Sequence, residues 1–241
     1  MPESASQPPP DAPRAPAPLR AAIYIDGFNL YYPIHESGMH QLKWTNLWKL
    51  GELICEPHNA TLVKAVFCTA LPKHYPDKHG RHVTFNAAQR ANGVTVILGH
   101  HLYDGERWNE KQTDINVALS LIVDGLEDVY DVAILVSADS DQAATAKMFA
   151  EKLKGKKLLA VSPPERPVSD KVKPYVWKSF TLGLPLLERC VMNAPVMGKT
   201  GLINRPKEYD PPADWVHPDD RAKGKPGKPP KVWSKAYKAE K

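Results

Sequence analysis

The chain has 241 residues, of which 42% are hydrophobic and 24% charged, and this ordinary composition favours one compact domain with tails over two full domains. The net charge of +5 is uneven, because residues 221–241 carry eight Lys/Arg against Glu240, a charge of +7, which leaves 5 − 7 = −2 for the rest. The three cysteines lack metal-type spacing, which argues against a disulfide framework and favours a reducing compartment, the cytoplasm by default. No apolar run approaches the roughly 20 residues that a membrane-spanning helix needs.

The two ends of the chain differ in composition from the middle. Residues 1–18 contain seven prolines and are expected to form a disordered Pro-rich leader. The folded domain is expected over residues 19–190. Residues 191–241 are expected to form an extended, basic, Pro/Lys-rich tail in which Trp233 and Tyr237 lie among lysines, a composition that suits contact with RNA about as well as simple solubilisation.

Within residues 19–190, apolar runs of strand length alternate with stretches of helical period. The runs predict strands at 21–25, 61–70, 94–98, 131–137 and 156–162. The helical stretches predict a helix capped by Thr45, then helices at 79–92, 114–128 (with Thr113 as its cap) and 140–154. Strands separated by helices predict an α/β fold, a Rossmann-like open parallel sheet with helices on both faces and right-handed crossovers.

Acidic residues follow two of the predicted strands. Asp26 ends the first strand, and Asp139 and Asp141 follow the fourth, while Asp114 opens the long helix. In open α/β sheets the functional crevice lies outside the carboxyl ends of the strands, so these carboxylates are expected to converge there. A carboxylate at a helix N-terminus is often only a favourable cap, but several converging anions need a cation, and oxygen ligands suit Mg²⁺ or Mn²⁺.

Asp124 is expected to lie outside this site. It follows Asp114 by ten residues in the same predicted helix, which places it about 15 Å further along the axis. A surface or cap interaction is therefore the expected role of Asp124.

Three segments together resemble a known family. IYIDGFNLYY, KQTDINVALSLIVDG and YDVAILVSADSD look like the NYN domain, a branch of the PIN-like metal-dependent ribonucleases, in its bacterial LabA-like form, over residues 20–190. The resemblance implies that the chain is an endoribonuclease that uses Mg²⁺ or Mn²⁺ and acts on RNA. Two positions depart from the family pattern and bear on the number of bound ions, because Gln142 follows the DSD motif and Ser120 replaces an acid found in some members.

The resemblance also implies roles for individual residues. It makes Asp26, Asp114, Asp139 and Asp141 the catalytic metal ligands, with Asn29 and Ser137 as polar neighbours that contact the substrate. The bound metal would polarise the phosphate, activate water and steady the leaving oxygen. Lys111, three residues before Asp114, could offset phosphate charge, although an ordinary solvated lysine fits that position better.

Other motifs give weaker predictions. His74, His79 and His82 lie close in sequence but lack the further ligand that a zinc site needs. The pair His100-His101, which ends the third predicted strand, could contact substrate or simply form a polar edge. Tyr31-Tyr32 could stack on bases, although packing beneath the site is favoured.

The sequence leaves two alternative functions open. The first is a binding platform, in which the same fold with a weakened metal site recruits RNA or protein. The second is a Toprim-like phosphotransfer domain, which the DSD motif after a strand also fits, although Asp26 stands where that fold would carry a glutamate. A homo-oligomer and a protein partner bound through the tails are further possibilities.

Overall fold

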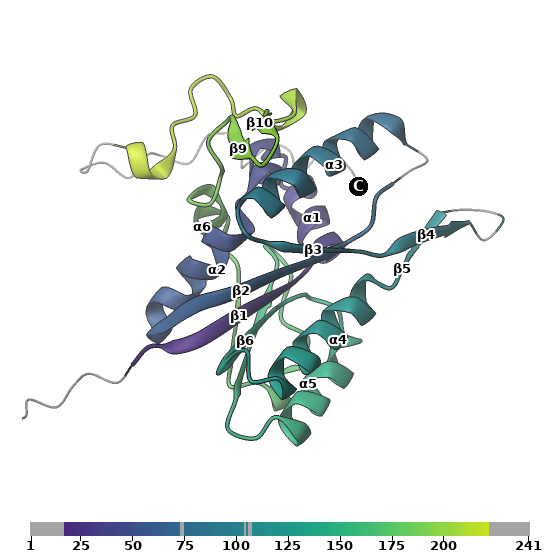
Figure 1. Cartoon of the computed structure of the whole chain (residues 1–241), viewed down its shortest axis with the longest axis vertical. Coiled ribbons are helices and arrows are strands. Elements are labelled where there is room, and N and C mark those ends of the chain that lie inside the picture. Colours follow the sequence, from purple (N-terminus) through teal and green to yellow (C-terminus); the bar gives the residue numbers. More distant parts are fainter. Residues whose placement is uncertain (1–16, 73–74, 104, 106–107, 222–241) are drawn as a thin grey trace, which may run out of the picture.

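The structure is a computed structural model that describes residues 17–72, 75–103, 105 and 108–221. Its main sheet consists of β1 (Leu19–Asp26), β2 (Ala60–Thr69), β3 (Thr95–Leu98), β6 (Val132–Val136), β7 (Lys157–Ser162) and β8 (Lys178–Thr181). These six strands are parallel and lie in the order β3-β2-β1-β6-β7-β8 (Figure 1). The predicted open parallel sheet is thereby confirmed, with β8 as an additional edge strand. The sequence did not predict β8, because all four of its residues are exposed and KSFT lacks the apolar run that marks a buried strand.

Helices cover both faces of the sheet, as predicted. They are α1 (Gly27–Glu36), α2 (Leu47–Cys55), α3 (Pro76–Ala91), α4 (Thr113–Leu126), α5 (Gln142–Lys152) and the short α6 (Leu184–Glu188). Side chains of β1 alternate between two cores, because Ile23 and Ile25 pack with α1, α2 and α6, whereas Ala22 and Tyr24 pack with α4 and α5. Figure 1 shows α2 and α6 on one side of the sheet and α4 and α5 on the other. The sequence did not predict α1, which contains Pro33, a residue that usually marks the end of a helix.

Two predicted helix caps are wrong. The side chain of Asn46 caps α2 by accepting a hydrogen bond from the Lys49 amide at 3.0 Å, while the Thr45 hydroxyl donates to the Leu42 carbonyl. At the start of α4, Thr113 is already helical and the preceding residue is Gln112, whose φ of +78° lies in the left-handed region. Such a backbone costs about 1–3 kcal/mol in a residue other than glycine, so the turn into α4 is a strained feature of the fold.

Two hairpins lie outside the main sheet. His100 and His101 begin β4 (His100–Tyr103), which pairs antiparallel with β5 (Trp108–Lys111), so they do not end the third strand as expected. Figure 1 shows this hairpin reaching away from the body. The second hairpin consists of β9 (Val196–Gly198) and β10 (Gly201–Ile203).

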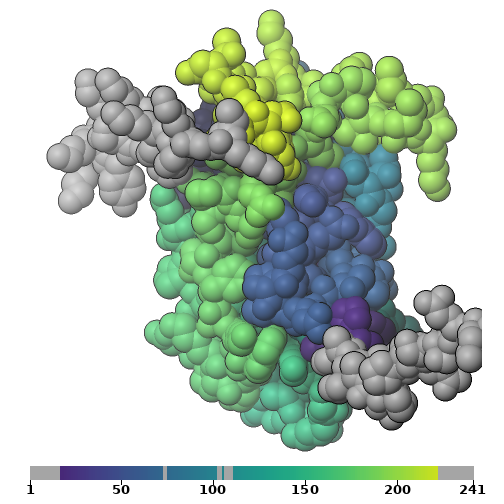
Figure 2. Space-filling model, turned by 90° about the vertical axis from the view of Figure 1, so that its left-hand side faces the viewer, coloured from purple at the N-terminus to yellow at the C-terminus, as the bar shows by residue number. Residues whose placement is uncertain are grey.

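The segment 191–221 packs against the body, which differs from the extended tail expected over 191–241. Its β9–β10 hairpin is followed by the short helices η4 (Lys207–Tyr209) and η5 (Pro218–Asp220). Tyr209 is only 4% exposed and shares a small core with Trp44, Ala88 and Met192. Figure 2 shows this segment lying across one end of the molecule. Residues 222–241, and so Trp233 and Tyr237, lie outside the described residues, as do residues 1–16.

No helix within the described part of the chain is both long enough and apolar enough to cross a bilayer.

Candidate active site at the carboxyl edge of the sheet

The site lies where the strand order of the sheet reverses. β1 and β6 are neighbours, with Ile25 paired to Val136, although they are far apart in sequence. Their carboxyl ends therefore place Asp26 and Ser137 beside each other at the edge of the sheet. Ligands of open α/β sheets bind in this position.

Asp26 is held firmly at the end of β1. Its side chain is the N-cap of α1, and its Oδ1 accepts hydrogen bonds from the amides of Phe28 and Asn29, both at 3.1 Å. Gly27 makes this sharp entry into α1 possible, because a Cβ there would lie 2.7 Å from the carbonyl oxygen of Cys68 on β2. The neighbouring Cys68 has its pKa raised to about 12 by burial and by the charge of Asp26, so it stays a thiol at neutral pH.

Asn29 links Asp26 to the loop between β6 and α5. The amide Nδ2 of Asn29 donates to Oδ2 of Asp26 at 2.7 Å, and its Oδ1 accepts from the backbone amide of Ala138 at 3.1 Å. One side chain thus fixes the first strand end relative to the segment that carries Asp139. The sequence suggested only a polar neighbour at this position, since a bridge of this kind depends on strand order.

Hydrogen bonds within the loop after β6 fix the positions of its polar residues. The Ser137 hydroxyl accepts from the amide of Asp139 at 3.1 Å, and Oδ1 of Asp139 accepts from the amide of Asp141 at 2.9 Å. Ser137 is 8% exposed, Asp139 is half-buried and Asp141 is exposed. The loop therefore presents two carboxylates of different exposure ahead of α5.

Gln142 ties this loop to the start of α4. Its Nε2 donates to the backbone carbonyl of Asp114 at 3.3 Å, and its side chain is 3% exposed. The other amide atom, Oε1, is buried, and it has no hydrogen-bond partner within the described residues. Asp114 itself is exposed in the first turn of α4. The residue that departs from the family pattern thus connects two of the predicted ligand segments.

The donor chemistry of the edge suits a hard divalent ion, since Asp26, Asp114, Asp139 and Asp141 offer only oxygen ligands. The structure brings their three segments to one edge through the Asn29 and Gln142 hydrogen bonds. Across the described ranges, no group of three or more His, Cys, Asp or Glu side chains is arranged to hold a metal ion. The edge therefore offers suitable ligands without a closed coordination shell.

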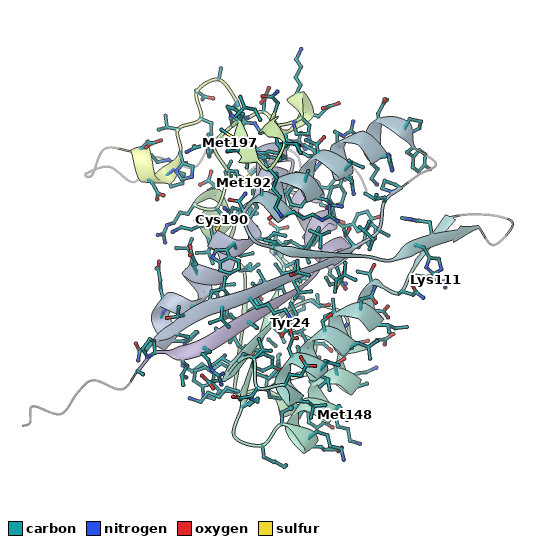
Figure 3. The ribbon with its side chains drawn as sticks, in the orientation of Figure 1. Tyr24, Lys111, Met148, Cys190, Met192 and Met197 are labelled. Atoms are coloured by element: carbon teal, nitrogen blue, oxygen red, sulfur yellow. The ribbon has the colours of Figure 1, made fainter. Side chains whose placement is uncertain are left out.

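Lys111 lies at the end of β5, just before the strained Gln112 turn into α4, and it is exposed. Figure 3 shows Lys111 on the projecting hairpin, away from the sheet. The turn is braced by His100, whose Nδ1 lies 3.0 Å from Oε1 of Gln112.

Asp124 occupies a buried position, so the expectation of a surface or cap role is wrong. Its side chain accepts from the hydroxyl of Tyr24 at 2.6 Å and from Nζ of Lys64 at 2.8 Å. Asp124 is 5% exposed and Tyr24, labelled in Figure 3, is fully buried between the sheet and α4. Burial and the nearby Asp124 charge raise the pKa of the Tyr24 phenol well above its ordinary value. This network is structural and lies apart from the carboxylate edge.

The aromatic and histidine motifs have different outcomes. Tyr32 is 47% exposed and Tyr31 is half-buried, so these tyrosines do not simply pack beneath the site. His82 is buried in α3, where burial and neighbouring cations lower its pKa to about 4. His74 lies outside the described residues, and the part of the chain that is described contains no zinc-type group.

Comparison with known proteins agrees with this architecture. The family model described as NYN domain matches residues 20–173. No curated protein matches the chain significantly. A crystal structure of a protein of unknown function from Vibrio parahaemolyticus RIMD 2210633 superposes with a TM-score of 0.51 at 19% identity, covering 70% of this chain and 96% of that one. The structural likeness supports the fold alone, and the family match favours NYN over the Toprim-like alternative.

Proposed function

The chain belongs to the NYN domain family, and from this premise we propose that it is a metal-dependent ribonuclease that hydrolyses phosphodiester bonds in RNA. The observation that supports the proposal most is the meeting of acidic segments at the point where strand order reverses, joined by side-chain hydrogen bonds of Asn29 and Gln142. A structural core needs no such set of carboxylates at one edge, of which Asp26 is buried, Asp139 is half-buried, and Asp114 and Asp141 are exposed.

In the proposed site, Asp26, Asp114, Asp139 and Asp141 hold Mg²⁺ or Mn²⁺. Such an ion, when bound, polarises the phosphate and lowers the pKa of an attacking water. Asn29 keeps the Asp26 carboxylate oriented by donating a hydrogen bond to its Oδ2. One lone pair of Oδ2 accepts this bond, and the other would be the one to bind the metal ion. Ser137 orients the backbone amide of Asp139 by accepting its hydrogen bond. Lys111, exposed at the end of β5, is proposed to offset the charge of RNA at the hairpin, away from the metal ligands.

A cleavage assay tests this proposal. Wild-type protein is expected to cut RNA in Mn²⁺ or Mg²⁺ and to stop in EDTA, because water activation needs the ion. Asp26→Asn and Asp139→Asn keep side-chain shape but remove a ligand charge, so each should be nearly inactive while still binding RNA. Asp170→Asn removes an acid that is fully solvent-facing in an ion pair with Lys173 and serves as the matched control.

The binding platform is the second candidate, and one observation favours it. Within the described residues the carboxylates do not form a group of three that could hold a metal. A platform would bind RNA with the same affinity in Mn²⁺ and in EDTA and would never cut it. Cleavage that persists in EDTA or in purified Asp139→Asn protein would contradict the proposed mechanism.

A further inference from the structure

A polar cavity lies beside α1, and its lining does not include the four carboxylates of the proposed metal site. It has a volume of about 340 Å³ and lies between α1, α3, the 40–44 segment and η4. This volume falls in the range of roughly 300–1,000 Å³ that is typical of small-molecule sites. Its walls carry the cations Lys43, Lys78 and Arg81.

Positive charge in this cavity is only partly compensated. Among the described residues that line it, the acid is Glu208, which pairs with Arg81 at 3.0 Å. Lys43 and Lys78 both direct Nζ at the ring of Tyr31, each 5.4 Å from its centroid. Burial, followed by the charges of Arg81 and Lys78, lowers the pKa of Lys43 to about 8. A bound anion would relieve this repulsion.

The net charge of the walls indicates which anion fits. Three cations and one acid give 3 − 1 = +2 when the histidines are neutral. A phosphate monoester carries about −1.5 to −2 at pH 7, whereas a phosphodiester carries one negative charge. The cavity therefore matches a terminal phosphate better than an internal one.

A row of aromatic rings connects this cavity to the carboxylate edge. Phe28, next to Asp26, stacks with Tyr32 at 6.0 Å, Tyr32 contacts Tyr31 at 5.6 Å, and Tyr31 stacks with His35 at 5.9 Å. The row follows α1, and His35 is nine positions after Asp26, or about 13.5 Å along the axis. Of these rings, Tyr32 and His35 are exposed and Phe28 and Tyr31 are half-buried, and accessible aromatic rings beside cations suit the bases of a single strand.

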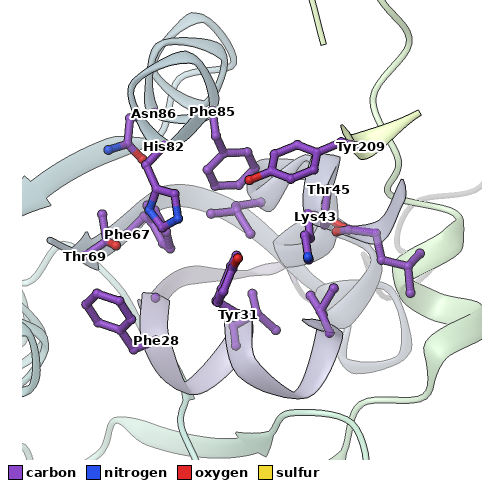
Figure 4. Close-up of a pocket in the computed structure, with 15 residues that line it drawn as sticks. Phe28, Tyr31, Lys43, Thr45, Phe67, Thr69, His82, Phe85, Asn86 and Tyr209 are labelled. Carbon is purple, nitrogen blue, oxygen red and sulfur yellow. The ribbon is translucent and has the colours of Figure 1, made fainter. Parts of the chain in front are cut away.

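The far end of the row meets the polar cavity, which Tyr31 and His35 both line. A smaller inner pocket of about 40 Å³ lies beneath it, lined by Phe28, Tyr31, Lys43 and Tyr209 among others. Figure 4 shows Phe28 and Tyr209 at opposite ends of this pocket, with Tyr31 between them. Tyr209 and Glu208 of η4 line the cavity, and the centroid of the Tyr209 ring lies 5.9 Å from Nζ of Lys43, so a strand that follows the rings from Asp26 reaches the cations here.

We propose that the cavity formed by Lys43, Lys78 and Arg81 binds the terminal phosphate of an RNA strand whose bases lie along the aromatic rings of α1. This inference rests on RNA as the substrate, as proposed above. It assigns the end of the strand to a site separate from the carboxylates, so binding of the phosphate needs no metal.

Fluorescence anisotropy in EDTA tests this without cleavage. The assay compares three single-stranded RNAs of about eight nucleotides with the same sequence. The first carries a 5′-phosphate, the second carries a 3′-phosphate, and the third has hydroxyls at both ends. One of the two phosphorylated RNAs is expected to bind about tenfold more tightly than the hydroxyl-ended RNA, as loss of a charge-assisted contact would predict. Equal affinity for all three RNAs would overturn the proposal, and this comparison needs no variant.

Two variants locate the effect. Lys78→Gln and Arg81→Gln should remove the preference for the phosphorylated end and leave the affinity for hydroxyl-ended RNA nearly unchanged. Lys152→Gln removes an exposed lysine at the end of α5 and is the control with the same change in charge. If the cavity variants weaken all RNAs equally, the cations contact the strand backbone and the proposal is wrong.

Two further measurements distinguish RNA from free phosphate as the ligand of the cavity, and failure of this proposal from failure of the ribonuclease proposal. Inorganic phosphate should compete only weakly, since it cannot stack on the rings, and competition as strong as that of phosphorylated RNA would overturn the assignment to RNA. Asp139→Asn should keep the end preference. An end preference without any cleavage by wild-type protein would therefore count against the ribonuclease proposal but not against this cavity.

Discussion

The buried contact between Tyr24 and Asp124 gives a sharp prediction about stability. Asp124→Ala removes the acceptor of the 2.6 Å bond from Tyr24 and the partner of Lys64 at 2.8 Å. Tyr24→Phe removes only the hydroxyl and leaves the ion pair and the ring packing in place. Because Asp124 lies about 15 Å along α4 from Asp114, neither change should reach the carboxylate edge.

The structure sets the size of each effect. A hydrogen bond to a charged group contributes about 1.5–3 kcal/mol, so Tyr24→Phe should lower the free energy of unfolding by about 2 kcal/mol. Asp124→Ala also leaves the buried Tyr24 hydroxyl unpaired, whereas Lys64, with 34% of its side chain exposed, can turn toward water. We therefore expect a loss of about 3 kcal/mol, or roughly 6–12 °C in Tm.

Urea denaturation of both single variants and the double variant measures these values. The double variant should cost less than the sum by about 1 kcal/mol or more, because no hydroxyl is then left unpaired. Asp170→Ala, whose side chain is 93% exposed, should change stability by less than about 0.5 kcal/mol. Additive losses of stability in the double variant, or an Asp124→Ala protein as stable as wild type, would refute the buried network. A reduction of RNA cleavage by more than a few-fold in Asp124→Ala would instead place Asp124 in the catalytic site.

Three other predictions concern separate parts of the molecule. Burial lowers the pKa of His82 to about 4, so between this value and the unfolded value near 6.5 the unfolded chain binds a proton that the folded chain does not. The free energy of unfolding should therefore fall by about 1–2 kcal/mol from pH 7 to pH 5. Urea titrations of His82→Gln should show a smaller fall, and an equal fall would count against this cause. Gln142→Leu removes the buried Oε1, which has no partner among the described residues, and should leave the free energy of unfolding unchanged or about 1 kcal/mol higher. A loss above about 2 kcal/mol would show that the bond from Nε2 to the Asp114 carbonyl dominates. Deletion of residues 222–241, with seven lysines, should flatten the salt dependence of RNA binding by about 0.7 log units per lost contact, and an unchanged slope would exclude the tail.

Much of the fold follows from local sequence signals, and so does the position of the acidic edge. Buried parallel strands are apolar throughout, and β1, β2, β6 and β7 carry such runs. Asp26 is the last residue of β1 and Asp139 lies three residues after the end of β6, and the carboxyl ends of parallel strands meet at one edge. The sequence therefore places these residues at the carboxyl edge, whereas the reversal of strand order between β1 and β6 is known only from the structure.

Other features depend on tertiary contacts that local patterns do not encode. The bridge that Asn29 makes to Ala138 needs β1 and β6 to be neighbours, and the bond from Gln142 needs α4 beside α5. The burial of Asp124 was detectable, since it follows Val117 and Leu121 at helical spacing on the buried face of α4. Its charge predicted a surface position, but hydrogen bonds from Tyr24 and Lys64 allow the carboxylate to be buried.

Binding of Mn²⁺, followed by the electron paramagnetic resonance signal of the free ion, tests the proposed carboxylate site most directly. Wild-type protein should bind Mn²⁺, and Asp26→Asn combined with Asp139→Asn should abolish binding. Asn29→Ala should weaken it about 10- to 100-fold by releasing the Asp26 carboxylate, and Asp170→Asn should not change it. A wild-type protein that binds no Mn²⁺, or a double variant that binds it as tightly as wild type, would contradict the assignment of the metal to this edge.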